Sequence, residues 1–116
     1  MVAMTPLRVI FYQTSAGRSP VEEFLDGLTD RQRAKALDAL DILEGAGYRL
    51  GPPWLKKVEA NLWELRVQAH KAWLRLFFCQ DGARFVILHG LKKKTDKLPQ
   101  RDLETARQRR RDHLGR

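Results

Sequence analysis

The sequence predicts an α+β fold, in which an antiparallel β-sheet packs on an N-terminal helical hairpin and is followed by a C-terminal helix. Three consecutive runs of alternating apolar and polar residues predict the sheet as a meander of strands. These runs span residues 62–68, 72–78 and 85–90. Two helix starts precede them, at residues 19–22 and 29–32, and one follows at Pro99. The predicted order is β-α-α-β-β-β-α, in a single domain over residues 1–116.

The N-terminal half is expected to form one strand and two helices. Residues 7–12 are rich in β-branched and aromatic side chains, as a first strand requires. Residues 19–22 form a capping box with proline at the first helical position, which opens a short helix. Residues 29–32 form a second capping box, and the helix that follows ends near residues 45–47. Its apolar stripe consists of Ala36, Leu37, Leu40 and Leu43.

In the C-terminal half, predicted turns separate the strands. The prolines at 52–53 break the chain, and residues 54–58 lead into the meander. A turn centres on residues 70–71, and residues 81–82 (Asp-Gly) predict a type I′ hairpin. The last helix begins at Pro99, with acidic residues early and arginines late, as the helix dipole prefers.

The predicted pairing places two arginines together. An even-numbered loop at residues 70–71 sets Arg66 opposite Arg75, Glu64 opposite Phe77 and Gln68 opposite Trp73. We call the sheet surface that carries these residues the arginine face. The other face, expected to pack on the helices, carries Trp63, Leu65, Val67, Leu74, Leu76 and Phe78. A two-residue loop at residues 81–82 sets Arg75 opposite Leu88, which predicts Lys92 on the arginine face and His89 on the helix side.

Like charges on neighbouring strands are unfavourable unless an anion lies between them. A phosphate group would satisfy Arg66 and Arg75, and the alternative is that Glu64 and solvent screen them. The lysines from Lys92 onward have two interpretations: they add positive charge next to Arg66 and Arg75, or they form a solvated loop. No His or Tyr is predicted on the arginine face, so the residue that acts as general base is left open.

Charge favours an anionic partner. The chain of 116 residues has a net charge of +8, and residues 92–116 contribute ten basic against four acidic residues. A nucleic acid or an acidic protein would complement this positive charge. No run of 18 apolar residues and no signal-peptide pattern occurs, so we expect a cytoplasmic protein that does not enter membranes. Cys79 is the single cysteine and the three histidines lack ligand spacing, so neither a metal site nor a cofactor is predicted.

The sequence resembles the phage Gp49-like branch of the HigB toxins, within the RelE/ParE superfamily. The matching segments are residues 9–12, Gly17, residues 19–25, 62–66, 74–77 and 88–95, Pro99 and Ala106. The resemblance implies a type II toxin of a toxin-antitoxin system. Such a toxin is a ribosome-dependent mRNA endonuclease (mRNA interferase) that inhibits translation, and a helix-turn-helix, HigA-like antitoxin neutralises it.

The resemblance also implies site residues. The 2′-hydroxyl of an mRNA nucleotide attacks the adjacent phosphodiester without a metal, and cations stabilise the phosphorane. The residues implied for catalysis are Arg75, Arg66 and Lys92, and those implied for RNA binding are Trp73, Lys93, Lys94 and Glu64. Two other functions remain open: a ParE-like inhibitor of DNA gyrase that does no chemistry, and a non-toxic, phage-derived nucleic-acid or protein binding module.

Overall fold

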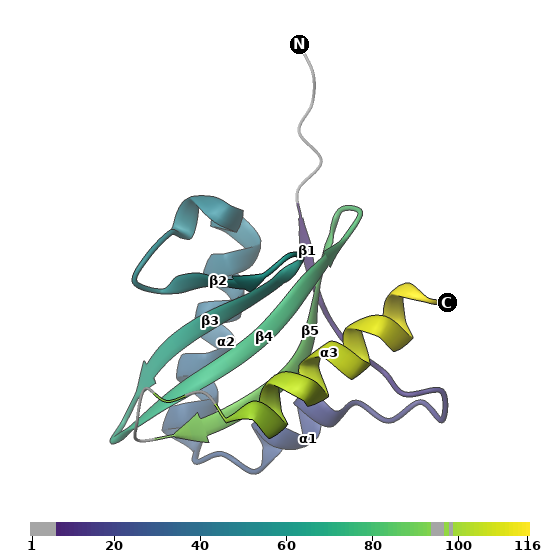
Figure 1. The fold of residues 1–116 in the computed structure, drawn as a ribbon. Coiled ribbons are helices and arrows are strands. Elements are labelled where there is room, and N and C mark those ends of the chain that lie inside the picture. The colour runs from purple at the N-terminus through teal and green to yellow at the C-terminus, as the bar shows by residue number, and fades with distance from the viewer. Residues whose placement is uncertain (1–6, 94–96, 98) are drawn as a thin grey trace.

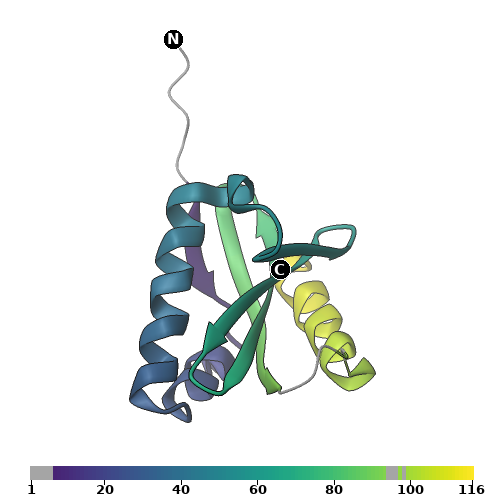
Figure 2. The same cartoon turned by 90° about the vertical axis from the view of Figure 1, so that its left-hand side faces the viewer.

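The computed structural model describes residues 7–93, 97 and 99–116, and it confirms the α+β class. A five-stranded sheet lies between two helical layers (Figure 1, Figure 2). The strands are β1 (Arg8–Phe11), β2 (Leu55–Glu59), β3 (Leu62–Ala69), β4 (Ala72–Asp81) and β5 (Arg84–Lys93), in the spatial order β1-β5-β4-β3-β2. The helices α1 (Pro20–Asp26) and α2 (Asp30–Ala46) cover one face, a short 3₁₀ turn (Gly47–Leu50) follows α2, and α3 (Gln100–Leu114) covers the other face.

The sheet differs from the prediction at both edges. β1 pairs with β5 in parallel, so the sheet is mixed and only its other pairs are antiparallel. The segment expected to lead into the meander forms a true strand, β2, which pairs with β3. The sequence missed both features because alternation of side chains shows that a strand exists but not which partner it pairs with.

The two predicted capping boxes have different outcomes. The box at the start of α2 forms: the Gln32 backbone N–H donates to Thr29 Oγ1 at 3.2 Å, and the Thr29 N–H donates to Gln32 Oε1 at 3.3 Å. The box at the start of α1 is wrong, because Ser19 is the N-cap but its side chain accepts no capping hydrogen bond. α1 still begins there, since Pro20 holds the backbone angle φ that a first helical residue needs.

Two apolar cores flank the sheet. The side chains of β3 and β4 that were predicted to face the N-terminal helices do so and pack with Val21, Leu25, Ala36, Leu40 and Leu43. The second core lies under α3 and contains Leu62, Phe77, Cys79, Val86, Leu88 and Leu91. Among the described residues, no helix is both long and apolar enough to cross a membrane.

Gly90 lets α1 approach the sheet. A Cβ atom at this position would lie 2.6 Å and 2.7 Å from two ring carbons of Phe24 and 3.0 Å from Leu76 Cδ2. We therefore expect Gly90→Ala to lower the free energy of unfolding by about 1–3 kcal/mol, the usual effect of overpacking. Urea denaturation measures this loss. Gly45→Ala is the matched control, since its Cβ would meet no atom within 4 Å, and an equal loss there would contradict the steric explanation.

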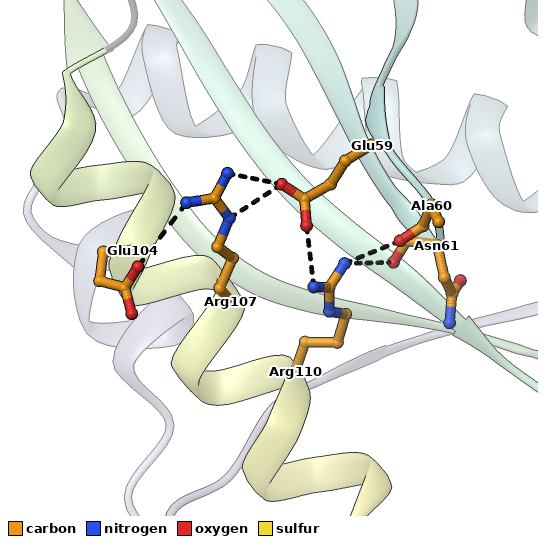
Figure 3. Close-up of polar contacts among 6 residues, drawn as sticks. All are labelled: Glu59, Ala60, Asn61, Glu104, Arg107 and Arg110. Atoms are coloured by element: carbon orange, nitrogen blue, oxygen red, sulfur yellow. Dashed lines mark hydrogen bonds and ion pairs between the residues drawn. The ribbon is translucent and has the colours of Figure 1, made fainter.

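Ion pairs hold α3 on the sheet. Only Leu103 and Ala106 of this helix are buried. Figure 3 shows the main polar contact: Glu59 on β2 accepts hydrogen bonds from Arg107 Nε at 2.8 Å and from Arg110 NH2 at 2.9 Å. Arg110 also donates to the backbone oxygen of Ala60 at 2.9 Å. The hydrogen bond from Arg107, followed by that from Arg110, lowers the pKa of Glu59 below its ordinary value of 4.5.

This contact predicts a pH dependence. A carboxyl group with a lowered pKa in the folded state stabilises the fold above its unfolded pKa, and this contribution is lost as the pH falls through the folded value. We expect Glu59→Gln to be less stable than the wild type at pH 7, with a difference that shrinks as the pH falls below 4.5. Urea denaturation across this range tests it. Glu104→Gln is the control and should change stability little, because Glu104 Oε2 lies 3.7 Å from Arg107 NH1 and the Glu104 side chain is largely exposed. An equal loss of stability in the two variants would contradict the role given to Glu59.

Candidate functional site

The hairpin of β3 and β4 has the predicted register. Arg66 pairs with Arg75, Glu64 with Phe77 and Gln68 with Trp73, across a two-residue loop in which Lys71 has a φ of 59°. The arginine face is therefore confirmed as a structural feature. It is continuous with the sheet surface that α3 covers, because Phe77 belongs to the core under that helix.

The hairpin of β4 and β5 differs from its prediction in two ways. Its loop is Gly82-Ala83 instead of Asp81-Gly82, with glycine at the first loop position and a φ of 61°, as a type II′ turn requires. This change alone keeps each side chain on its predicted face. A β-bulge opposite Phe77 and Phe78 then adds one residue to β5. Beyond the bulge, every β5 side chain lies on the face opposite to the predicted one.

The bulge corrects the placement of the lysines. Lys92 was predicted on the arginine face, but it pairs with Leu74 on the helix side, and its Nζ donates to Gln32 Oε1 of α2 at 3.2 Å. Lys93 instead pairs with Trp73 and is exposed on the arginine face. Lys94 lies outside the described residues.

The bulge also changes the face on which His89 lies. It was predicted on the face that packs on the N-terminal helices, but it lies on the face that α3 covers. Its ring stacks on Phe77, with centroids 6.3 Å apart. Arg109 NH1 lies 3.2 Å from Nδ1, and because a guanidinium can only donate, Nδ1 accepts. Nε2 therefore carries the proton and donates to Asp102 Oδ1 at 2.6 Å. Both ring nitrogens are thus occupied, and His89 fastens β5 to α3.

Glu64 lies between the two arginines. Its Oε1 is 3.3 Å from Arg66 Nε and 3.4 Å from Arg75 Nε. The carboxylate thus supplies an anion between the like charges, which was the alternative to a phosphate. The side chains of Arg75 and Glu64 are only 2% and 4% exposed, whereas that of Arg66 is 27% exposed. Arg75 is therefore buried within the arginine face, and of the two arginines Arg66 is the one that reaches solvent.

Trp73 and Lys56 complete the accessible part of the arginine face. The Arg66 guanidinium lies 5.9 Å from the centroid of the half-buried Trp73 ring, within cation–π range. Lys56 pairs with Glu64 and is exposed on the same face. Lys56 was not predicted as a site residue, because its segment was not expected to be a strand. No three His, Cys, Asp or Glu side chains come close enough to hold a metal within residues 7–93, 97 and 99–116.

Residues 23–111 match the family described as "Phage derived protein Gp49-like (DUF891)". The chain belongs to the Gp49-like family. No curated protein matches it significantly. The match covers the whole arginine face and most of α3.

The arginine face of this Gp49-like protein offers three exposed or partly exposed cations, Lys56, Arg66 and Lys93, and one aromatic ring, Trp73, which lies beside Arg66 and Lys93. Such a combination suits a single-stranded nucleic acid, whose phosphates meet the cations and whose bases stack on the ring. Arg66 is the cation best fixed in direction, because Glu64 holds its Nε and Trp73 lies under its guanidinium. A fixed cation costs little to reorganise when charge develops on a phosphate.

Proposed function

We propose that this protein is the toxin of a toxin-antitoxin pair and acts as a HigB-type, ribosome-dependent mRNA endonuclease. One observation carries the proposal: a partly exposed arginine, held by a buried carboxylate and an aromatic ring, lies among cations on the sheet of a Gp49-like protein. The net charge of +8 favours an RNA-rich target.

The proposed reaction is an internal transesterification. The 2′-oxygen of the RNA forms a bond to phosphorus and the bond from phosphorus to the 5′-oxygen breaks. This leaves a 2′,3′-cyclic phosphate and a 5′-hydroxyl, with the proton of the 2′-hydroxyl passing to a base and the 5′-oxygen gaining one. Arg66 stabilises the charge on the phosphorane, and Trp73 stacks on a neighbouring base. Arg75 acts through Glu64 as a positioning residue, because its side chain is buried.

Expression from a tightly controlled promoter, with mRNA ends mapped in growing cells, tests the proposal. We expect growth arrest, new mRNA ends with 5′-hydroxyl groups, and rescue by a helix-turn-helix antitoxin expressed beside the protein. The antitoxin is expected to keep the toxin from the ribosome. Its expression should therefore reduce the number of new mRNA ends and relieve the growth arrest together. Harmless expression of folded wild-type protein would contradict this function.

The burial of Arg75 and Glu64 favours a second candidate, a binding protein without chemistry, because a buried ion cluster is sufficiently explained by a structural role. An inhibitor of DNA gyrase and a non-toxic binding module both belong to this class. The same expression experiment separates them when plasmid supercoiling is measured as well. Growth arrest with altered DNA supercoiling and no new mRNA ends indicates the inhibitor, and no arrest indicates the module.

The two neighbouring lysines give a matched test of RNA binding. Lys93→Gln removes a cation from the arginine face, whereas Lys92→Gln removes one that contacts α2. We expect only Lys93→Gln to reduce the slope of log affinity against log salt, by about 0.7 for one lost phosphate contact with single-stranded RNA. Fluorescence anisotropy with a labelled oligonucleotide gives both slopes. Equal slopes for the two variants would show that the bulge does not select the RNA-binding lysine.

A further inference from the structure

A groove runs between α2 and β3, on the side of the sheet away from α3. One end is a hollow of about 430 Å³ lined by apolar side chains that include Ala39, Ile42, Leu50 and Trp54. A second hollow of about 360 Å³ is lined by Arg31, Lys35, Asp38 and His70. Lys35 and Asp38 line both hollows, so the two are continuous. We call this feature the α2–β3 groove.

The apolar end of the α2–β3 groove is exposed to solvent. Ile42 is 55% exposed and Trp54 is 43% exposed. Large apolar side chains gathered beside a hollow are typical of binding surfaces. The other end is cationic, because Arg31 and Lys35 outweigh Asp38 there.

The backbone edge of β3 that faces this groove is open at Gln68. The Arg66 N–H donates to the Trp54 oxygen at 2.7 Å, away from β4. Gln68, two residues further along, points its N–H and C=O to the same side. β2 begins only at Leu55, opposite Leu65, so within the described residues no strand covers Gln68. An open strand edge can accept a further strand.

We propose that the α2–β3 groove binds an extended segment of a partner protein that is apolar at one end and acidic at the other, and that the backbone of this segment pairs with Gln68. The groove follows α2 from Arg31 to Ile42, about 16 Å at 1.5 Å per residue. An extended segment of about five residues spans this length. The groove borders the arginine face at Arg66, and the proposed binding does not depend on nuclease activity.

A protein segment fits the groove better than RNA does. RNA carries a phosphate on every nucleotide and needs cations along its whole path, whereas the two cations that α2 contributes, Arg31 and Lys35, lie toward one end of the groove. The opposite end is lined by aliphatic side chains and Trp54, which suit apolar residues of a peptide. The backbone N–H and C=O of Gln68 can also pair with a peptide backbone. RNA has no regularly spaced donor and acceptor groups that could pair with them in this way.

Two synthetic six-residue peptides test the proposal. In the first, Ile and Leu alternate with Thr in one half, and Asp and Glu alternate with Thr in the other half. The second has Lys in place of each Asp and Glu. We expect the acidic peptide to bind wild-type protein at least about tenfold more tightly than the basic one, as measured by fluorescence anisotropy. Amide hydrogen exchange at Gln68 should become slower in the complex.

Ile42→Asp and Leu37→Asp form a matched pair of variants. Both residues are exposed on α2, but only Ile42 lines the groove, and Leu37 is 45% exposed. We expect Ile42→Asp to weaken binding of the acidic peptide at least about tenfold and Leu37→Asp to leave it unchanged. Equal binding by both variants, or no binding of the acidic peptide by wild-type protein, would overturn the proposal. So would a single-stranded oligonucleotide that displaces the peptide equally well from wild-type protein and from Arg66→Ala, since the groove itself would then bind RNA.

Discussion

Arg66→Ala is expected to lower the rate of RNA cleavage by about 10²–10³-fold and to leave the fold intact. The loss has this size because removing one positioned donor from a developing anion typically costs that much in rate. The fold should tolerate the change, since the side chain is 27% exposed and Glu64 keeps its contact with Arg75. Cleavage of ribosome-bound mRNA, with urea denaturation of the same sample, measures both quantities.

Two further variants sharpen this prediction. Arg66→Lys keeps the charge but loses the planar fork that binds phosphate in two places, so it should recover only part of the rate. Arg8→Ala removes the same charge from β1, at the far edge of the sheet, and should leave cleavage unchanged. Full activity of Arg66→Ala would remove the arginine face from the proposed mechanism.

Arg75→Ala is expected to destabilise the fold by about 3–5 kcal/mol, the usual cost of removing one partner from a buried ion pair. Its side chain is 2% exposed and lies 3.4 Å from a Glu64 oxygen that is itself buried. The substitution therefore leaves a buried carboxylate with less compensation and opens a cavity in the sheet surface. Urea denaturation followed by tryptophan fluorescence measures the loss.

Arg31→Ala is the control for Arg75→Ala, because it removes an exposed arginine from α2 and should change stability by less than about 0.5 kcal/mol. The outcome also decides between two roles for Arg75. A stable but inactive Arg75→Ala protein would indicate that this guanidinium contacts the phosphate directly, as the family resemblance implies. An unstable protein with activity that recovers under stabilising conditions would support the positioning role.

The sequence by itself determined the fold class, the helix positions and the register of the first hairpin. These features depend on local chemistry. The capping box at Thr29 fixes the start of α2 within four residues, and alternation with a two-residue turn fixes which side chains of β3 and β4 share a face. The pairing of Arg66 with Arg75 could therefore be predicted without coordinates.

Only the tertiary structure decided which residues of β5 join that face and how far the arginines reach solvent. The bulge after Ile87 turns His89 toward Asp102 and Arg109 of α3 and turns Gly90 toward Phe24 of α1. The bulge in β5 therefore goes together with contacts to residues that are distant in the sequence. The alternating pattern within one strand contains no information about these contacts, so it could not predict the bulge. The burial of Arg75 has the same kind of cause, because exposure depends on everything packed around a side chain and not on the strand that bears it.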